Sequence, residues 1–208
     1  ASHLANIIER EEIPEKDLQK ISHLKTSQEV FGVFEIPKWK VTSKELQGEL
    51  SLVLDRINDP GNLGTIVRIA DWFGIRNIIC SPDTVDLYNP KAVQSTMGSI
   101  ARVRVIYEDL PAFLSGFSGM PDFPVYGCYL KGENLYTTQL KRQGLIVMGS
   151  ESHGISETLK KYIQYPVFIP SFSPDQSAGA ESLNVSIAAG IVCSEFRRRE
   201  SVMPNHSK

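Results

Sequence analysis

Residues 50–73 read LSLVLDRINDPGNLGTIVRIADWF and contain a strand, a turn and a helix in that order. The apolar run LSLVL is typical of a buried strand. The Asp-Pro-Gly that follows is turn chemistry, and Asn62 is a predicted N-cap for a helix that runs to about Phe73. A strand joined to a helix in this way is the repeating unit of an α/β fold with a parallel sheet.

The rest of the chain repeats this alternation of apolar strands and amphipathic helices. Strands are predicted at 50–55, 76–80, 101–107, 124–130, 144–149 and 165–169. Helices are predicted at 62–73, 90–98, 109–116, 155–163 and 183–199. The sequence therefore predicts an α/β fold in which helices flank a parallel sheet.

One side of the first long helix is polar. Its apolar stripe on a 3.6-residue wheel comprises Leu63, Ile66, Val67, Ala70 and Phe73. Gly64, Arg68 and Asp71 fall opposite. A glycine inside a helix costs about 1 kcal/mol relative to alanine, so Gly64 is expected to let a ligand approach Arg68 closely. The alternative is an ordinary surface ion pair between Arg68 and Asp71.

A second polar segment, GSESHG at 149–154, follows the apolar strand at 144–149. Active sites of open α/β sheets gather at such strand ends. Ser150 stands where the nucleophile elbow G-x-S-x-G requires glycine, and the patterns G-x-G-x-x-G and G-x-x-x-x-G-K-[ST] do not occur. The hydrolase, dinucleotide and P-loop interpretations therefore lose their main support.

The third segment, SLNVSIAAG at 182–190, opens the last helix with three polar residues, Ser182, Asn184 and Ser186. A polar helix start presents backbone N–H groups and short side chains to a ligand. The alternative interpretation is a simple N-cap.

Together the three segments resemble the motifs of the SpoU–TrmH branch of the knotted SPOUT RNA methyltransferases. The motif N-x-G-x-x-x-R is matched by Asn62, Gly64 and Arg68, and G-x-E-x-x-G by Gly149, Glu151 and Gly154. The motif S-L-N-V-S-x-A is matched by Ser182 through Ala188. Order and spacing agree over roughly residues 48–200.

The resemblance implies a SPOUT-type parallel sheet flanked by helices, with a carboxyl-terminal deep trefoil knot. It implies transfer of a methyl group from S-adenosylmethionine to a ribose 2′-hydroxyl of rRNA or, as the second choice, tRNA. The expected assembly is a homodimer through the knotted domain. Two alternatives stay open: a non-catalytic RNA-binding protein that retains the fold, and a SPOUT methyltransferase that modifies a base.

The resemblance also predicts the site residues. The predicted catalytic residues are Arg68, Asn62, Glu151, Ser182 and Asn184, and the predicted cofactor-binding residues are Leu130, Gly149, Gly154, Ile169 and Leu183. A guanidinium with a pKa above about 12 is a poor general base. We therefore expect Arg68 to bind a phosphate of the target and to stabilise negative charge on the 2′-oxygen.

Three segments are predicted along the chain. Residues 1–47 are expected to be the end of an RNA-binding-like amino-terminal domain or a structural extension, and 48–200 the methyltransferase domain. Residues 201–208 are expected to form a flexible tail.

The charge balance gives no general basic excess, because 22 Lys and Arg face 24 Asp and Glu. Binding to RNA must then depend on local basic patches. The candidates are Arg197-Arg198-Arg199, Lys160-Lys161, Lys141-Arg142 and the pair Arg102 and Arg104. Each run has the alternative of being a solvated surface.

The three cysteines, Cys80, Cys128 and Cys193, lie in apolar runs without metal-ligand spacing. They are interpreted as buried thiols of a reducing compartment, so we predict a cytoplasmic protein without a metal site. No apolar run approaches the roughly 20 residues that span a bilayer, and we expect no membrane association.

Overall fold

The computed structural model describes residues 11–21, 29–173 and 181–202. The chain divides into two compact units, Ala1–Lys38 and Trp39–Lys208. This boundary lies before the predicted one at 47/48. The reason is that helix α2 (Ser43–Leu46) already belongs to the second unit, where Leu46 is fully buried in a hydrophobic core.

The described part of the first unit contains one helix, α1 (Glu15–Ile21), which has no buried residue. Residues 30–38 form neither helix nor strand and are exposed. The sequence at 26–34 predicts a turn that leads into a strand, but residues 30–34 form no strand. That this unit belongs to an RNA-binding domain stays a prediction.

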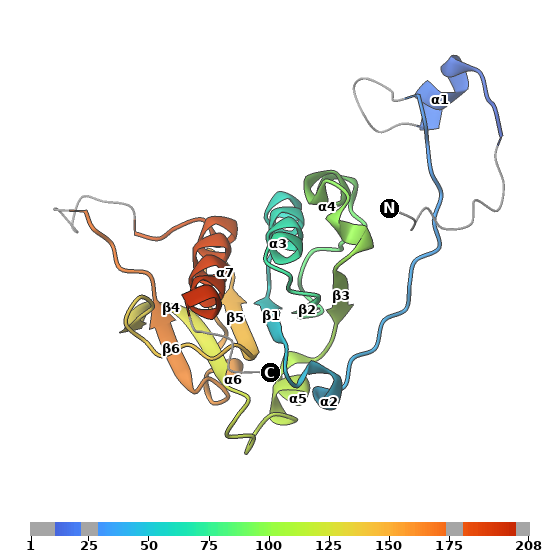
Figure 1. Ribbon diagram of the computed structural model, residues 1–208. Coiled ribbons are helices and arrows are strands. Elements are labelled where there is room, and N and C mark those ends of the chain that lie inside the picture. Colours follow the sequence, from blue (N-terminus) through green and yellow to red (C-terminus); the bar gives the residue numbers. More distant parts are fainter. Residues whose placement is uncertain (1–10, 22–28, 174–180, 203–208) are drawn as a thin grey trace. The chain divides into compact units, whose positions relative to one another are not determined.

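The second unit is built on a six-stranded sheet in which every neighbouring pair of strands is parallel (Figure 1). Its strands are β1 (Leu50–Asp55), β2 (Asn77–Cys80), β3 (Arg104–Tyr107), β4 (Val125–Asn134), β5 (Gly144–Gly149) and β6 (Tyr165–Phe168). The order is β3-β2-β1-β5-β4-β6. The predicted α/β fold with a parallel sheet is confirmed, whereas the knot stays a prediction.

The helices of this unit also include α3 (Pro60–Trp72), α4 (Pro90–Thr96), α5 (Leu110–Ser115), α6 (Glu157–Lys160), α7 (Val185–Val202) and the 3-10 turn η1 (Ser99–Ala101). Two boundaries differ from prediction in ways that matter below. Helix α6 begins two residues later than expected, and α7 takes in Ser201 and Val202 of the predicted flexible tail. Residues 203–208 lie outside the described part.

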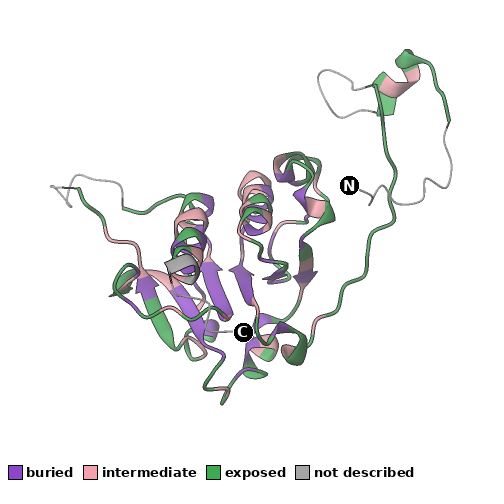
Figure 2. Cartoon of the chain, in the orientation of Figure 1, coloured by how far each residue is buried: buried purple, intermediate pink, exposed green. Residues whose placement is uncertain are grey.

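The central strand β1 is buried on both faces (Figure 2). Leu52 and Leu54 face a core that includes apolar side chains of α3 and α7. Val53 points the other way, into a core shared with α2, α5 and α6. Two apolar faces explain why β1 is a continuous hydrophobic run instead of an alternating one.

The connections leave β1 and β5 in opposite directions. After β1 the chain moves to β2 on one side, and after β5 it moves to β6 on the other side of the sheet. These neighbouring strands end together, because Asp55 pairs with Gly149. Ligands of open α/β sheets bind in the crevice at the carboxyl ends of such a divergent pair.

Gly64 serves packing between helices and not the approach of a ligand, so that prediction was wrong. The residue is buried, and a Cβ added to it would lie 2.4 Å from the carbonyl oxygen of Ala92 and 2.5 Å from Cβ of Ser95. Both of these belong to α4. The missing side chain therefore lets α3 and α4 pack backbone against backbone.

We predict that Gly64→Ala lowers the free energy of unfolding by about 2–3 kcal/mol, because α4 must move away from α3. Gly190→Ala is the matched control, since this glycine also lies inside a helix but its added Cβ would meet Ile69 at an ordinary 3.6 Å. The control should be neutral or stabilising by up to about 1 kcal/mol. Equal denaturant midpoints for the two variants would contradict this account.

Candidate active site

Three side chains from the three sequence motifs meet at the carboxyl ends of β1 and β5. The Asn62 side-chain amide donates to Oε1 of Glu151 at 2.5 Å. The Asn184 amide donates to the same oxygen and to Oδ1 of Asn62, both at 3.1 Å. One carboxylate oxygen thus joins the first turn of α3 to the residue that precedes α7. We call these three residues the Asn–Glu–Asn cluster.

The start of α3 leaves the Asn62 side chain available for this cluster. The N-cap is Asp59, not Asn62 as predicted, and its carboxylate accepts from the Asn62 backbone N–H at 2.9 Å. Lys91 donates to Asp59 at 3.0 Å, and this hydrogen bond, with the Asn62 N–H, holds the pKa of the Asp59 carboxyl below its usual value. Because Asp59 caps the helix, the Asn62 amide can turn to Glu151.

The sequence places Glu151 at the amino terminus of the helix that follows, but the residue lies in a tight turn, because α6 begins only at Glu157. Ser150 and Gly154 form an antiparallel bridge, and Gly154 has a positive φ of 64°. A Cβ on Gly149 would lie 2.1 Å from the carbonyl carbon of Gly154. Both glycines of this motif are therefore required by the turn itself, which holds Glu151 above the strand end.

Asn184 is an N-cap, one of the two interpretations that the sequence offered, and it also belongs to the cluster. Its Oδ1 accepts from the backbone N–H groups of Ser186 at 2.9 Å and Ile187 at 3.3 Å, and from the Ser186 hydroxyl at 2.6 Å. The side chain therefore caps the first turn of α7. Its amide NH2 remains free to donate to Glu151 and Asn62, so capping fixes the direction of these donors.

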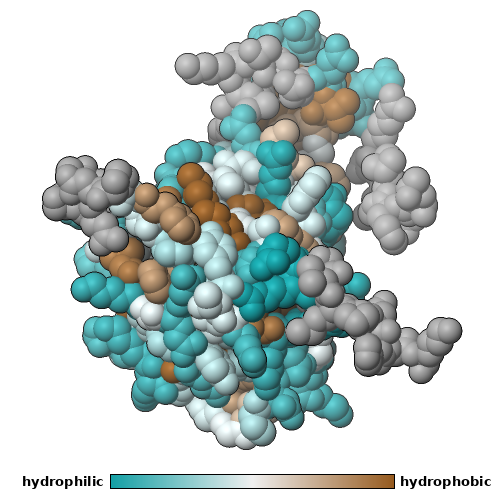
Figure 3. Space-filling view, turned by 60° about the vertical axis from the view of Figure 1, so that its left-hand side comes forward, coloured by the Kyte–Doolittle hydropathy of each residue, from teal (hydrophilic) through white to brown (hydrophobic). Residues whose placement is uncertain are grey.

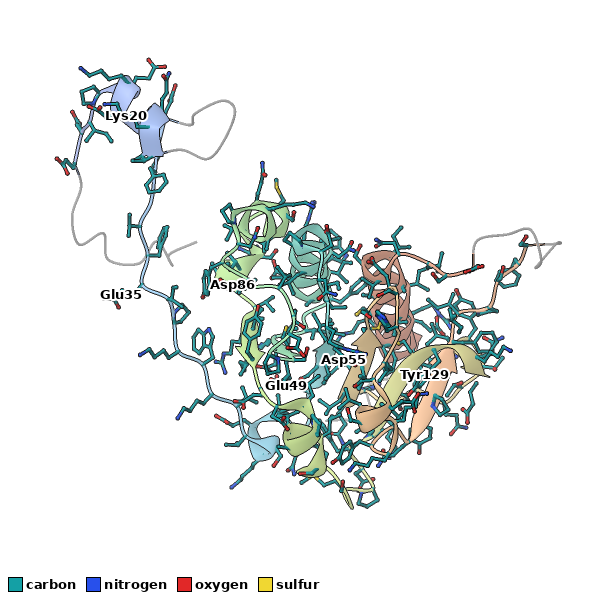
Figure 4. All side chains as sticks on the ribbon, turned by 180° about the vertical axis from the view of Figure 1, so that it is seen from behind. Lys20, Glu35, Glu49, Asp55, Asp86 and Tyr129 are labelled. Atoms are coloured by element: carbon teal, nitrogen blue, oxygen red, sulfur yellow. The ribbon has the colours of Figure 1, made fainter. Side chains whose placement is uncertain are left out.

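Sequence reasoning missed two residues that support the turn. Asp55, labelled in Figure 4, is 3% exposed and accepts from the Ser156 N–H at 2.7 Å, which fixes the chain just before α6. Arg56 has a φ of 59°, in the left-handed region, and donates to the Gly154 carbonyl at 3.4 Å. The available signal was a charged pair that ends an otherwise apolar strand.

Arg68 does not join the cluster. It is exposed, and among the described residues no side chain or carbonyl forms a hydrogen bond or ion pair with it. On α3 it lies about 9 Å beyond Asn62 and roughly 120° around the axis. The alternative pairing with Asp71 is also wrong, because Asp71 binds Arg102 at 2.7 Å. That arginine holds the pKa of the Asp71 carboxyl below its usual value.

The predicted cofactor-binding residues Leu130, Ile169 and Leu183 lie in β4, directly after β6 and just before α7. Leu130 is 70% exposed and lies where residues 129–132 bulge out of the ladder between β4 and β6. Leu183 is 45% exposed before α7, and Ser182 is exposed beside it without a hydrogen-bond partner among the described residues. Ile169 packs partly buried against the core after β6.

Most residues of the predicted basic patches have partners within the protein. Arg198 and Arg199 bind Glu195, which is 5% exposed, and they hold the pKa of its carboxyl below the usual value. Arg199 also donates to the carbonyls of Thr138 and Tyr136. Other basic side chains are engaged as well: Arg102 by Asp71, Lys160 by Glu157, and Arg104 by the Trp39 ring. These contacts stabilise the fold before any RNA is considered.

The cysteines are free thiols, as the sequence indicated, with Cys80 and Cys193 buried and Cys128 partly exposed. Burial raises the pKa of Cys80 and Cys128 far above the usual range and that of Cys193 to about 12. Thiols this hard to ionise are poor nucleophiles. Within the described ranges no three His, Cys, Asp or Glu side chains gather to hold a metal ion. None of the helices described there is long and apolar enough to cross a membrane.

Comparison with known proteins connects this geometry to a family. The family model "SpoU rRNA Methylase family" matches residues 49–194. The 23S rRNA (guanosine(2553)-2′-O)-methyltransferase RlmP of Bacillus subtilis is 27% identical over 89% of this chain and 71% of its own length. A protein named as an uncharacterized tRNA/rRNA methyltransferase of Synechocystis is 34% identical over 73% of this chain and 54% of its own length.

Solved structures of proteins named as members of this family are similar to this chain. A Porphyromonas gingivalis protein assigned to the TrmH family of RNA methyltransferases superposes with a TM-score of 0.76 at 39% identity, over 90% of this chain and 74% of that protein. The SpoU methyltransferase AviRb from Streptomyces viridochromogenes, crystallised with S-adenosylmethionine, gives a TM-score of 0.67 at 26% identity. It is matched over 75% of this chain and 59% of its own.

The cluster predicts energetic coupling between its members. Glu151→Ala and Asn62→Ala should couple by about 0.5–1 kcal/mol in a double-mutant cycle on the free energy of unfolding, because each removes the same partly exposed hydrogen bond. Asp109→Ala is the control partner for Glu151→Ala. It removes the N-cap of α5 and shares no hydrogen-bond partner with Glu151, so this pair should be additive within about 0.5 kcal/mol. Additivity in both cycles would contradict the cluster.

Proposed function

The chain belongs to the SpoU rRNA methylase family, and we propose that it transfers a methyl group from S-adenosylmethionine to a ribose 2′-hydroxyl of RNA. The observation that carries the proposal is the meeting of Asn62, Glu151 and Asn184 at the divergent strand pair. Three motifs that are far apart in the sequence are joined there by hydrogen bonds. A protein that kept only the fold would not need this arrangement.

The loops around the cluster fit S-adenosylmethionine. The bulge at residues 129–132 takes main-chain N–H and C=O groups out of the sheet ladder, where they can bind adenine and ribose. Leu130 and Leu183 add exposed apolar side chains that can cover the cofactor and exclude water. We assign these residues, with the turn 149–154 and Ile169, to cofactor binding.

The chemistry divides between the cofactor and the side chains. When bound, S-adenosylmethionine supplies a methyl group on a positively charged sulfur. Arg68 binds the phosphate beside the target ribose and stabilises negative charge on the attacking 2′-oxygen. The pKa of a guanidinium is too high for it to take the proton, which passes to a phosphate oxygen or a water.

The Asn–Glu–Asn cluster positions the reacting groups. Glu151 holds both asparagine amides, so that the start of α3 and the start of α7 keep a fixed separation. Ser182 and Asn184 offer short polar side chains toward cofactor and ribose. Fixed positions matter because in-line methyl transfer depends on the alignment of the reacting atoms.

We assign rRNA as the substrate in preference to tRNA, because relatives such as RlmP are named for 23S rRNA. The ribose specificity follows the same names, and modification of a base is the competing activity. The cytoplasmic location inferred from the thiols stays a prediction.

Arg68→Ala is expected to lower the methylation rate by at least about 100-fold, the usual cost of a lost transition-state contact. The dissociation constant for S-adenosylmethionine, measured by calorimetry, should be unchanged, because Arg68 contacts the target and not the cofactor. Arg102→Ala is the control, since this arginine is already paired with Asp71, and it should keep its activity. Retained activity in Arg68→Ala would remove this residue from the mechanism.

The same assay separates the competing functions. Nucleosides released from the modified RNA should carry the methyl group on the ribose, and a methylated base would establish the base-modifying activity instead. Failure of the wild-type chain to bind S-adenosylmethionine would favour a non-catalytic RNA-binding protein.

We also propose that the protein is a homodimer through the outer faces of α3 and α7. Figure 3 shows hydrophobic side chains exposed on the side of the unit that α7 occupies. Ile187 is 56% exposed on α7, and Trp72 is 85% exposed at the end of α3. Exposed apolar side chains on neighbouring helices are typical of an interface. Arg68 lies one turn before Trp72 and would border it.

Ile187→Glu should therefore convert the dimer into a monomer in sedimentation experiments, because it places a charge in the apolar interface. Val93→Glu is the matched control, as Val93 is 39% exposed on α4, and it should leave the dimer intact. A wild-type monomer at micromolar concentration would refute the assembly.

A further inference from the structure

We propose that a hollow at the amino ends of β1 and β5 binds a phosphate group of the RNA strand at a distance from the methyl-transfer site. This inference rests on the proposed function, because it assigns a second contact to the same RNA. The hollow has a volume of about 310 Å³. Its walls are formed by Gly48, Glu49, Leu50 and Gly74, with three arginines, Arg76, Arg142 and Arg197.

The charge of the hollow favours an anion. Three arginines and one acidic residue, Glu49, line the hollow. The Arg76 side chain is 75% exposed and forms a long ion pair with Glu49, whose Oε1 lies 3.9 Å from Nη1 of Arg76, too far for a hydrogen bond. Arg142 is exposed and forms no hydrogen bond or ion pair with the described residues. Two guanidinium groups are thus available to a ligand.

The third arginine is anchored. Arg197 donates to the carbonyls of Phe73 at 2.7 Å and Gly74 at 3.3 Å, at the end of α3. These bonds hold its charge at the wall of the hollow. Its neighbours in sequence, Arg198 and Arg199, turn to Glu195 instead. Lys141, next to Arg142, likewise turns away, to the carbonyl of Pro121. The fold therefore selects one arginine from each of two basic runs.

Two glycines leave open space in the wall of the hollow. Gly48 and Gly74 have positive φ angles of 86° and 65°, and a Cβ added to either would meet nothing within 4 Å. Their lack of side chains leaves the backbone accessible beside the arginines. Planar guanidinium groups bind phosphate oxygens in pairs of parallel hydrogen bonds, which favours a phosphate over a chloride-like ion.

An RNA strand suits this place better than a small anion. Glu49 and Asp55, both labelled in Figure 4, lie at the two ends of β1. At about 3.3 Å per residue over the six steps from Glu49 to Asp55, the hollow is roughly 20 Å from the catalytic edge along this strand. On each strand of a DNA duplex one phosphate occurs per about 3.4 Å of helix axis, and on that scale roughly six nucleotides cover the distance. With a chain net charge of −2, such local contacts must provide the attraction for RNA.

The test is the double variant Arg76→Ala/Arg142→Ala, which leaves Arg197 and its bonds to α3 in place. Binding of a fluorescein-labelled RNA hairpin of arbitrary sequence is measured by anisotropy over a range of salt concentrations. Loss of one phosphate contact should reduce the slope of log K against log[salt] by about 0.7–0.9 and weaken binding about 10-fold at 0.1 M salt. An unchanged slope would overturn the proposal.

The control is Arg102→Ala/Lys160→Ala, which removes the same total charge from side chains paired with Asp71 and Glu157. It should keep the wild-type slope. An equal loss of slope in the control would show a net-charge effect and overturn a local site. Millimolar inorganic phosphate could raise the unfolding temperature of the wild type but not of the Arg76→Ala/Arg142→Ala variant. If RNA binding is the same for both proteins, that result would assign the hollow to a free anion and overturn the proposal of an RNA site.

Methylation separates this inference from the proposed function. In the Arg76→Ala/Arg142→Ala variant the KM for RNA should rise, while kcat and the dissociation constant for S-adenosylmethionine stay unchanged. If the wild type does not methylate RNA but the variant still has a smaller salt slope than the wild type, the proposed function is refuted and the phosphate site in the hollow is supported. Methylation with an unchanged slope would do the reverse.

Discussion

The pairing of β1 with β5 is the constraint on which the rest of the unit depends. The two strands run in register from Leu50 opposite Gly144 to Asp55 opposite Gly149, and both are almost wholly buried. Because the chain then leaves them toward opposite sides of the sheet, their carboxyl ends cannot be covered by one connection. The polar residues that follow each strand are thereby brought to the same crevice. The buried carboxylate of Asp55, which holds the Ser156 N–H, ties the loop after β5 to the end of β1.

The Asn–Glu–Asn cluster converts that strand pairing into a defined site. A single oxygen of Glu151 accepts from two amides, and each amide belongs to the start of a different helix. The helices are capped so that these amides are available: Asp59 caps α3, and Asn184 caps α7 through its own oxygen. Arg68 lies outside this arrangement and is unpaired among the described residues. This separation suits a division of labour in which the cluster fixes the geometry and the arginine meets the RNA.

The basic side chains are also divided, between those that pair within the protein and those that stay exposed. Glu195, Asp71 and Glu157 engage basic side chains that a count of lysines and arginines would assign to RNA. Such contacts hold α7 against the segment after β4 and η1 against α3. Among the described residues, Arg76 and Arg142 stay exposed at the amino ends of β1 and β5, on the edge opposite the Asn–Glu–Asn cluster. With a net charge of −2, any attraction for a polyanion must come from such local groups.

The sequence by itself determined the strands, the helices and the parallel sheet, because burial on both faces leaves continuous apolar runs and turn residues punctuate them. It also identified Asn62, Glu151 and Asn184, because the three motifs that contain them resemble those of the SpoU–TrmH family. It could not assign their partners. Asp59 and Asn62 are both good N-cap residues, and only the folded backbone shows that Asp59 takes that role. Gly64 looked like an opening for a ligand, yet α4 fills the space, because helix packing brings distant segments together. Tertiary structure also decided which partners the side chains of Arg68, Arg142 and Arg197 have. Whether an arginine is paired depends on neighbours from distant segments, which sequence spacing does not reveal.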